Sequence, residues 1–217
     1  MEINGLIDHT NLKQNATAED IKKLCAEAKQ YKFATVAINS CWVSLAHAEL
    51  EGSGVGITSC VGFPLGAAST AAKVAEAKQS VADGTTEIDM VINGGHLVAG
   101  DDDYVIADIK AVVEAAGSVP VKVILECCLL DDEQIVRACK DCMAAGAAFV
   151  KTSTGFSTGG ATVHDVAVEH FQRIVVARNH DDLSRKPRRI RARPMFALQI
   201  AATVDMATMA GFPQFSR

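Results

Sequence analysis

The sequence predicts an α/β protein in which parallel strands alternate with helices and close into a barrel. Short apolar runs rich in β-branched residues alternate with helical stretches along most of the 217 residues. Strands that are apolar throughout are typical of a parallel sheet covered by helices. The repeat recurs about every 25–30 residues, which suits a (β/α)8 barrel of roughly 200–250 residues. An open dinucleotide-binding sheet is the alternative, but its G-x-G-x-x-G turn is missing after the first strand.

Five apolar runs are predicted as strands because they are short and bounded by turn or helix signals. They are residues 34–39 (ATVAIN), 55–63 (VGITSCVGF), 86–92 (TEIDMVI), 119–126 (VPVKVILE) and 147–152 (AAFVKT). Residues 3–8 are a further candidate strand at the start of the chain.

Helical patterns lie between these runs. One opens with TAED, a capping box, and another opens with DDEQ, an acidic first turn, and stops at Gly146. The predicted helices are residues 17–31, 71–82, 101–116, 131–145 and 162–178.

The repeating pattern breaks after the last of these helices. Only 39 residues remain there, whereas two more strand–helix units need roughly 54 at the observed spacing. The remainder holds a basic run at 188–193 and an apolar, helix-like stretch at 196–210, without a clear seventh or eighth strand. We therefore predict a TIM-type barrel that is incomplete or altered at strands 7 and 8. Residues 1–172 form its body, and residues 173–217 form a divergent basic tail rather than a separate domain.

Charge and composition narrow the function classes. Residues 1–172 carry 12 Lys and Arg against 23 Asp and Glu, and residues 173–217 carry 9 against 3. An acidic body argues against nucleic acid as the main partner, although the basic tail is a candidate polyanion site. No apolar run reaches the roughly 18 residues of a membrane helix, and MEINGLIDHT lacks the features of a secretory signal. We expect a cytoplasmic protein whose seven Cys are reduced thiols.

Lys151, in the run AGAAFVKTSTGFSTGG, is the strongest candidate for chemistry. It ends a buried strand, and the carboxyl ends of barrel strands face the active site. Burial disfavours the ammonium form, and only a neutral amine attacks a carbonyl to form a Schiff base. The alternative is a lysine with a buried stem whose ammonium reaches water.

Charged residues on neighbouring strands support the first interpretation. Lys122, Ile124 and Glu126 share one face of their strand, as do Glu87, Asp89 and Val91 of theirs, by the period of two. Buried charges are rarely unpaired, so we expect these faces to meet inside the barrel. Lys122 would be a second cation near Lys151, and Asp89 could shuttle protons directly or through water. A structural ion pair is the alternative for Asp89.

Other motifs give weaker signals. The Gly, Ser and Thr residues of 152–160 could offer backbone N–H groups to an anion, or simply connect a strand to a helix. Cys139 and Cys142 form a C-x-x-C inside a helical pattern without a second pair, which indicates core or surface cysteines rather than zinc ligands. The six His are scattered without H-x-x-x-H or H-E-x-x-H spacing, so no metal site is predicted.

Several segments taken together resemble the deoxyribose-phosphate aldolases, class I aldolases with a TIM-barrel fold. The matching stretches are IDHTNLKQNAT (7–17), VGFPLGA (61–67), EIDMVINGG (87–95), VKVILECCLL (121–130) and VKTSTGFSTGGAT (150–162). The similarity runs through about residue 168, and the pair VKTSTGF and EIDMVIN is highly specific.

The resemblance implies reversible cleavage of 2-deoxy-D-ribose 5-phosphate to acetaldehyde and D-glyceraldehyde 3-phosphate, without a cofactor. It implies that Lys151 is the Schiff-base nucleophile, that Asp89 relays protons and that Lys122 is an active-site lysine. Asp8, Thr10 and Thr152 would contact the substrate, a small phosphorylated sugar. A homo-oligomer is a further expectation, since an exposed apolar stretch at 196–210 would favour association.

The chain departs from this family after the fifth quoted stretch. A strand ending in a KASGGIR-like motif and a final GTSxG-like phosphate loop are both missing, and Lys186 in SRKPRRI has different surroundings. A shift of reading frame or a replaced gene end would produce such a break. We therefore expect reduced or absent activity. Two alternatives stay open: a related Schiff-base lyase with other aldehydes, and an inactive derivative whose basic tail binds a partner or polyanion.

Overall fold

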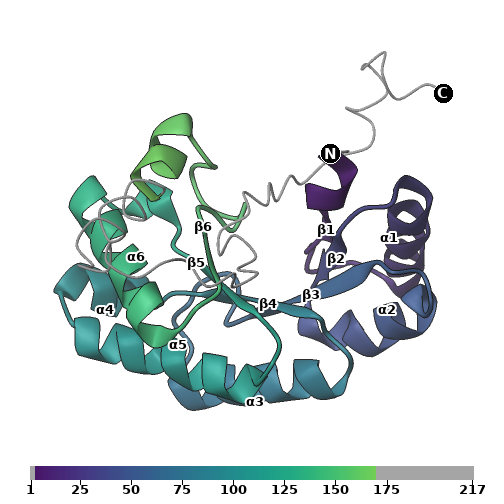
Figure 1. Cartoon of the computed structure of the whole chain (residues 1–217), viewed down its shortest axis with the longest axis horizontal. Coiled ribbons are helices and arrows are strands. Elements are labelled where there is room, and N and C mark those ends of the chain that lie inside the picture. Colours follow the sequence, from purple (N-terminus) through teal and green to yellow (C-terminus); the bar gives the residue numbers. More distant parts are fainter. Residues whose placement is uncertain (1–2, 170–217) are drawn as a thin grey trace, which may run out of the picture. The chain divides into compact units, whose positions relative to one another are not determined.

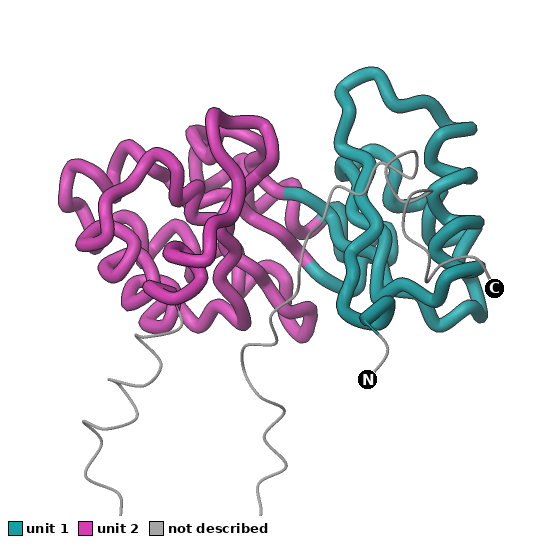
Figure 2. The backbone as a smooth tube through the Cα atoms, turned by 90° about the horizontal axis from the view of Figure 1, so that it is seen from above, with its two compact units in different colours: residues 1–60, 79–87, 198–217 teal, residues 61–78, 88–197 magenta. Residues whose placement is uncertain are grey.

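The computed structural model describes residues 3–169 of the 217-residue chain. The described residues form two compact units, shown in teal and magenta in Figure 2. The first comprises residues 3–60 and 79–87, and the second comprises residues 61–78 and 88–169. Each unit contains strands with helices packed against them, as the alternating sequence pattern predicts.

Six parallel strands follow one another in the order of the sequence, β1-β2-β3-β4-β5-β6 (Figure 1). The strands are β1 (Asp8–Asn11), β2 (Thr35–Ile38), β3 (Gly56–Val61), β4 (Glu87–Val91), β5 (Val121–Ile124) and β6 (Phe149–Lys151). The helices are α1 (Ala18–Tyr31), α2 (Val43–Leu50), α3 (Thr70–Ala82), α4 (Gly94–Ala99), α5 (Asp102–Ala116) and α6 (Asp132–Ala145). Short 3-10 turns are η1 (Ile3–Leu6), η2 (Ser40–Trp42) and η3 (Cys127–Leu129). The strand–helix alternation predicted from the sequence is confirmed.

The first unit has a core between helix α1 and strand β2. Ile21, Leu24 and Ala28 of α1 recur at helical spacing and are all buried, and they pack with the apolar residues of β2. The predicted capping box begins this helix. Thr17 Oγ1 accepts the Asp20 N–H at 3.3 Å, and the Asp20 carboxylate accepts the Thr17 N–H at 2.8 Å.

The prediction of a strand at residues 3–8 is wrong for most of that segment. Residues Ile3–Leu6 form the 3-10 turn η1, in which the N–H of Ile7 donates to the carbonyl of Asn4 at 3.1 Å. The Asn4 side chain also donates to the carbonyl of Tyr31 at 2.9 Å, which fixes the turn against the end of α1. Strand pairing starts only where Asp8 aligns with Thr35.

The second unit contains β4, β5 and β6, with helices α5 and α6 packed against each other. Buried Ile109 and Val112 of α5 and buried Ile135 of α6 form part of its core. Asp131 caps the start of helix α6 and forms a capping box with Gln134, and Gly146 caps its end with a left-handed φ of 83°. The acidic start and the glycine stop predicted for this helix are therefore confirmed.

Two helices, α2 and α4, were not among the predicted ones. Helix α4 is only six residues long and begins with two glycines, so neither propensity nor periodicity reveals it. The Asn93 side chain starts it by accepting the N–H of His96. Helix α2 has eight residues and follows a 3-10 turn without a side-chain cap. Both helices depend on tertiary packing, because isolated helices this short are unstable in water.

The last predicted helix, 162–178, is helical from residue 163 to residue 169, where the described part of the chain stops. The basic run, the apolar stretch at 196–210, Lys186 and the predicted loss of strands 7 and 8 all lie outside the described residues. Between residues 3 and 169, no helix combines the length and the hydropathy that a membrane crossing requires.

Candidate active site

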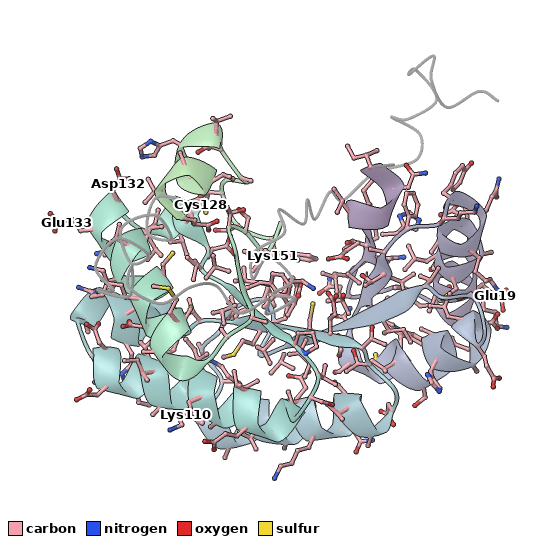
Figure 3. All side chains as sticks on the ribbon, viewed as in Figure 1. Glu19, Lys110, Cys128, Asp132, Glu133 and Lys151 are labelled. Carbon is pink, nitrogen blue, oxygen red and sulfur yellow. The ribbon has the colours of Figure 1, made fainter. Side chains whose placement is uncertain are left out.

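Asp89 lies in the middle of β4 and contacts two lysines of the same unit, one on β5 and one on β6. Its Oδ2 is 2.6 Å from the Nζ of Lys151, and its Oδ1 is 3.1 Å from the Nζ of Lys122. The side chains of Asp89 and Lys122 are buried, and that of Lys151 is 14% exposed. In Figure 3, Lys151 lies at the end of β6, whereas Lys110 and Glu133 lie on the outer helical surface.

Strand register explains this convergence. Asp89 aligns directly with Lys122 across β4 and β5, and Ile124, two residues later on β5, aligns with Lys151 of β6. Side chains two residues apart share a face of the sheet, so Lys122 and Lys151 point to the side on which Asp89 stands. The prediction that the charged faces of these strands meet is confirmed for these three residues.

Burial alone raises the pKa of Asp89, but the ammonium groups of Lys151 and Lys122 outweigh it, and the net effect lowers the pKa. Asp89 is therefore ionised at neutral pH although it has no exposed surface. One carboxylate faces two amines, so it can neutralise only one ammonium group at a time. The arrangement can accept a proton from an amine or return one to it within hydrogen-bond distance.

Glu126 does not lie on the strand face predicted for it. Strand β5 ends at Ile124, and Glu126 adopts a left-handed conformation with φ 57° and ψ 58° that turns the chain into η3. Its carboxylate accepts the N–H of Thr154 at 3.2 Å and the hydroxyl proton of the same residue. The prediction of one face for Lys122, Ile124 and Glu126 is wrong at its last member, because the strand is shorter than its apolar run.

The segment after Lys151 begins with Thr152 and Ser153, which are half-buried, and continues with exposed residues up to Thr158 apart from the buried Thr154. The carbonyl of Thr152 accepts the N–H of Cys127 at 2.8 Å, and its Oγ1 accepts the hydroxyl proton of Ser153 at 3.2 Å. Thr152 directly follows Lys151 in the chain. Its contact with substrate, and anion binding by residues 152–160, stay predictions.

Asp8 and Thr10 belong to the first unit. Asp8 is 1% exposed, and its Oδ1 accepts the hydroxyl proton of Thr35 at 2.6 Å. The Thr35 hydroxyl also lies 2.9 Å from that of Thr58, so a polar chain crosses β1, β2 and β3. The Thr10 hydroxyl donates to the carbonyl of Asp8 at 2.8 Å. The geometry described here joins Lys151, Asp89 and Lys122, and the substrate-side roles of Asp8 and Thr10 stay predictions.

A buried ion pair near the end of β4 was not found from the sequence. The Nζ of Lys73, on α3, lies 2.6 Å from Oδ2 of Asp108 and donates to the carbonyl of Val91 at 3.1 Å. Lys73 is 0% exposed and Asp108 is 1% exposed. The sequence feature that could have revealed this pair is helical spacing. Lys73 is four and seven residues before Ala77 and Ser80, which are buried, so it lies on the inward face of the same helix.

All seven cysteines are free thiols. Cys139 and Cys142 are both buried in α6, so of the two predicted positions, core or surface, the structure places them in the core. Burial, with a smaller contribution from Glu169, raises the pKa of Cys139 to about 12. In residues 3–169 no group of three or more His, Cys, Asp or Glu side chains is arranged to hold a metal ion.

Comparison with known proteins gives one consistent family. A model of the DeoC/LacD family aldolases matches residues 4–196. A curated deoxyribose-phosphate aldolase from Bacillus cereus (strain AH187) is 58% identical over 169 residues, which are 77% of this chain and 76% of the relative. A curated deoxyribose-phosphate aldolase from Clostridium novyi (strain NT) is 59% identical over 167 residues, covering 76% of this chain and 75% of that one.

Solved structures agree. The crystal structure of a putative deoxyribose-phosphate aldolase from Coccidioides immitis has a TM-score of 0.79 and 42% identity, covering 80% of this chain and 68% of that chain. The tetrameric deoxyribose phosphate aldolase from Aeropyrum pernix has a TM-score of 0.74 and 32% identity, covering 80% of this chain and 74% of that chain. The α/β barrel-type fold predicted from the sequence is thus confirmed, with six of its strands among the described residues. With its family model and its closely similar relatives in agreement, the chain belongs to the DeoC/LacD family of aldolases.

Proposed function

We propose that the protein is a deoxyribose-phosphate aldolase that cleaves 2-deoxy-D-ribose 5-phosphate reversibly to acetaldehyde and D-glyceraldehyde 3-phosphate through a Schiff base on Lys151. The observation that carries the proposal is the group formed by Lys151, Asp89 and Lys122, with 2.6 Å and 3.1 Å separating the carboxylate oxygens from the two amines. The curated relatives that the chain resembles carry the same activity in their names.

The first step needs a neutral amine beside a proton acceptor. Asp89 Oδ2 is 2.6 Å from Lys151 Nζ, so it is placed to receive the ammonium proton before the amine attacks C1 of the open-chain sugar. The attack forms a C–N bond and a carbinolamine. Return of the proton to the carbinolamine hydroxyl releases water and leaves a protonated imine on Lys151.

The imine then makes carbon–carbon cleavage possible. A base, directly or through water, removes the proton from the C3 hydroxyl, the C2–C3 bond breaks, and its electron pair moves into the imine to give a neutral enamine. Glyceraldehyde 3-phosphate leaves with C3 as its aldehyde carbon. Protonation of the enamine at its terminal carbon and hydrolysis by water release acetaldehyde and regenerate the lysine. Without the imine, the same cleavage would need a high-energy acetaldehyde carbanion.

Lys122 contributes a fixed positive charge on the other carboxylate oxygen. Its ammonium holds Asp89 in place and lies 6.0 Å from the centre of the Phe149 ring. We assign Lys122 an electrostatic role in the reaction and Lys151 the covalent one.

Covalent trapping tests the proposal. Incubation with acetaldehyde and borohydride should add one ethyl group to the wild-type chain, located at Lys151 by peptide mass spectrometry. Lys151→Arg keeps the positive charge but cannot form the imine, so it should show neither the adduct nor cleavage of the sugar phosphate. Lys110→Arg, on the outer surface of α5, is the matched control and should behave like wild type. An unmodified Lys151 in the wild-type protein would remove the covalent mechanism.

A further inference from the structure

We infer that Glu126 is a positioning residue for Lys151: it fastens the segment after β6 and so holds the amine beside Asp89. The inference rests on the proposed function only for the role of the amine. It concerns a buried carboxylate outside the group of Asp89, Lys122 and Lys151, which lies just beyond the end of β5.

The backbone of Glu126 is set in an uncommon conformation. Its φ of 57° lies in the left-handed region, which residues other than glycine, asparagine and aspartate adopt rarely. The residue is 8% exposed, so its carboxylate has been removed from water. Both features cost free energy, and a folded chain keeps them only where the surroundings impose them. Here the conformation directs the side chain to the segment that follows Lys151.

Thr154 satisfies both oxygens of that carboxylate. Its N–H donates to Oε1 at 3.2 Å, and its hydroxyl donates to Oε2. The Thr154 hydroxyl oxygen in turn accepts the N–H of Phe156 at 3.0 Å. Glu126 is therefore linked through Thr154 to the backbone N–H groups of residues 154 and 156. Thr154 is also the one buried residue among residues 152–158.

Two backbone hydrogen bonds place this connection directly next to the lysine. The N–H of Leu125 donates to the carbonyl of Lys151 at 2.9 Å, and the N–H of Cys127 donates to the carbonyl of Thr152 at 2.8 Å. Strand β6 has only three residues, and all three are partly exposed, unlike the buried β5. A strand this short has few hydrogen bonds to its neighbour. The Glu126–Thr154 hydrogen bonds therefore add to those of the strand in fixing the position of Lys151.

A ring contact also fixes the far end of the segment after β6. The ring of Phe156 meets that of Phe63 edge to face, with centroids 5.3 Å apart, so the Thr154–Phe156 turn is held at its far end as well. Lys151 reaches Asp89 at 2.6 Å from the near end. Without the Glu126 carboxylate, Thr154 would lose the hydrogen bonds that fix it between Lys151 and Phe156. A displacement of about 1 Å at a reacting group can lower a rate by up to two orders of magnitude.

Carboxylate chemistry is required at this position. Thr154 presents two donors, a backbone N–H and a hydroxyl, and only a carboxylate offers two acceptor oxygens in one plane. Glutamine would replace one acceptor by an amide NH2, and aspartate is one methylene too short to span the same distance. Valine at position 154 would keep the N–H contact and remove the hydroxyl, and serine would keep both.

The test compares five variants with the wild type: Glu126→Ala, Thr154→Val, the double variant of these two, Thr154→Ser and Asp131→Ala. The last removes the cap of α6 and lowers stability without touching the segment after Lys151, so it separates positioning from general destabilisation. Three quantities are measured: hydrogen exchange in peptides covering residues 152–158, acetylation of Lys151 by acetic anhydride relative to Lys110, and the rate of trapping by acetaldehyde and borohydride.

Positioning by Glu126 predicts opposite changes in the last two measurements. Exchange at 152–158 should speed up, and acetylation of Lys151 should rise towards that of Lys110, because the amine leaves Asp89. Imine trapping at Lys151 should slow by about tenfold, because its proton acceptor is no longer adjacent. Glu126→Ala and Thr154→Val should show these changes, their combination should add little, and Thr154→Ser and Asp131→Ala should resemble wild type.

Equal acetylation of Lys151 in wild type, Glu126→Ala and Thr154→Val would overturn the inference. So would a fall in the trapping rate of Asp131→Ala as large as that of Glu126→Ala. Thr154→Val keeps the test decisive if Glu126→Ala does not fold. Failure of the proposed function looks different: wild-type protein would give no adduct at Lys151. Exchange and acetylation do not depend on aldol chemistry, so they still decide whether Glu126 positions the lysine.

Discussion

At the scale of single residues, Asp89 carries the electrostatics of the site. It is fully buried, and the amines of Lys122 on β5 and Lys151 on β6 approach its two oxygens. Breaking a buried ion pair by removing one partner is much more costly than forming the pair is favourable, since the remaining charge loses its compensation. Substitution of this one residue should therefore change both stability and rate.

We expect Asp89→Asn to lower the free energy of unfolding at pH 7 by roughly 3–5 kcal/mol. The rate of sugar-phosphate cleavage should fall by about 10²–10⁴-fold, the usual contribution of a positioned proton acceptor. The folded protein lowers the pKa of Asp89 from its ordinary 3.8, so this stabilisation is complete above that pH. It is lost as the pH falls through the lower, folded value.

Denaturant unfolding of both proteins between pH 3 and pH 8 measures this difference. The gap between wild type and Asp89→Asn should be constant above about pH 5 and should narrow below pH 4. Asp108→Asn is the control, because it breaks the buried pair with Lys73 instead. Asp108→Asn should lose a similar amount of stability but far less of the cleavage rate. That result would show that Asp89, unlike Asp108, acts in the reaction. Equal rate losses in both variants would contradict a specific role for Asp89.

Asp141, on α6, is predicted to destabilise the folded protein at neutral pH. Burial, followed by the nearby Asp102, raises the pKa of Asp141 to about 6, and Arg137 only partly opposes this. The folded state then holds the proton more tightly than the unfolded chain does. Its contribution is favourable at low pH and is lost as the pH rises from about 4 through about 6.

Asp141→Asn should therefore raise the free energy of unfolding at pH 7.5 by about 1 kcal/mol and leave it nearly unchanged at pH 4. Thermal unfolding at the two pH values gives the measurement. Asp103→Asn, an exposed aspartate of α5, should shift neither value by more than a few tenths of a kcal/mol. A loss of stability in Asp141→Asn at pH 7.5 would show that the ionised carboxylate is the favoured form.

At the scale of elements, the connections after the strands decide where functional residues stand. The turn after β3 depends on Gly66, which has φ +68° and whose missing Cβ would clash with the carbonyl oxygen of Ile92. Ile92 follows β4 directly, so this close approach fixes the turn against the strand that carries Asp89. Only glycine combines a left-handed φ with the absence of a side chain at such a contact.

Gly66→Ala should accordingly cost more than 3 kcal/mol of stability, because both backbone strain and a steric clash oppose the new methyl group. Gly54→Ala provides a matched control. Gly54 has φ +80° but open space where a Cβ would stand, so only the conformational cost of about 1 kcal/mol applies. Thermal unfolding of the two variants gives the comparison. Similar losses in both would mean that the contact with Ile92 relaxes freely.

At the scale of the whole molecule, the chain matches its relatives over about three quarters of their length. The family motifs for a second assisting lysine and a final phosphate loop are missing from the sequence after residue 168. A charge-assisted hydrogen bond contributes about 1.5–3 kcal/mol, so the loss of phosphate contacts should be visible in substrate choice. The alternative of a related lyase acting on other aldehydes requires that the protein no longer recognises the substrate phosphate.

We expect kcat/KM for 2-deoxyribose 5-phosphate to exceed that for unphosphorylated 2-deoxyribose by less than about tenfold, because the family's phosphate loop is missing. Steady-state cleavage of both sugars by the same protein sample measures the ratio, and the Lys151→Arg protein provides the background. A preference of a thousandfold or more would show that other residues, with 152–160 as the first candidate, bind the phosphate. That outcome would exclude the lyase with other aldehydes.

Local features of the chain were predictable because local physics determines them. The capping box at Thr17, the acidic first turn and the glycine stop of α6 and the alternation of apolar strands with helices all depend on neighbours within a few residues. Strand bounds were predicted too long, since an apolar run continues into the turns that pack on the core. Lys151 and Asp89 were found because charges inside apolar strands are costly and need a reason.

The sequence by itself determined the class of fold, most element positions and the three charged residues to which we assign chemical roles. Tertiary structure alone decided how those residues pair. The parallel register sets Asp89 opposite Lys122 and brings Lys151 to the same carboxylate. Only the fold shows that Glu126 leaves its strand to reach Thr154, and that Lys73 is buried against Asp108. Periodicity fixes which face of an element a residue occupies, but its partner depends on where distant segments end and how they are aligned.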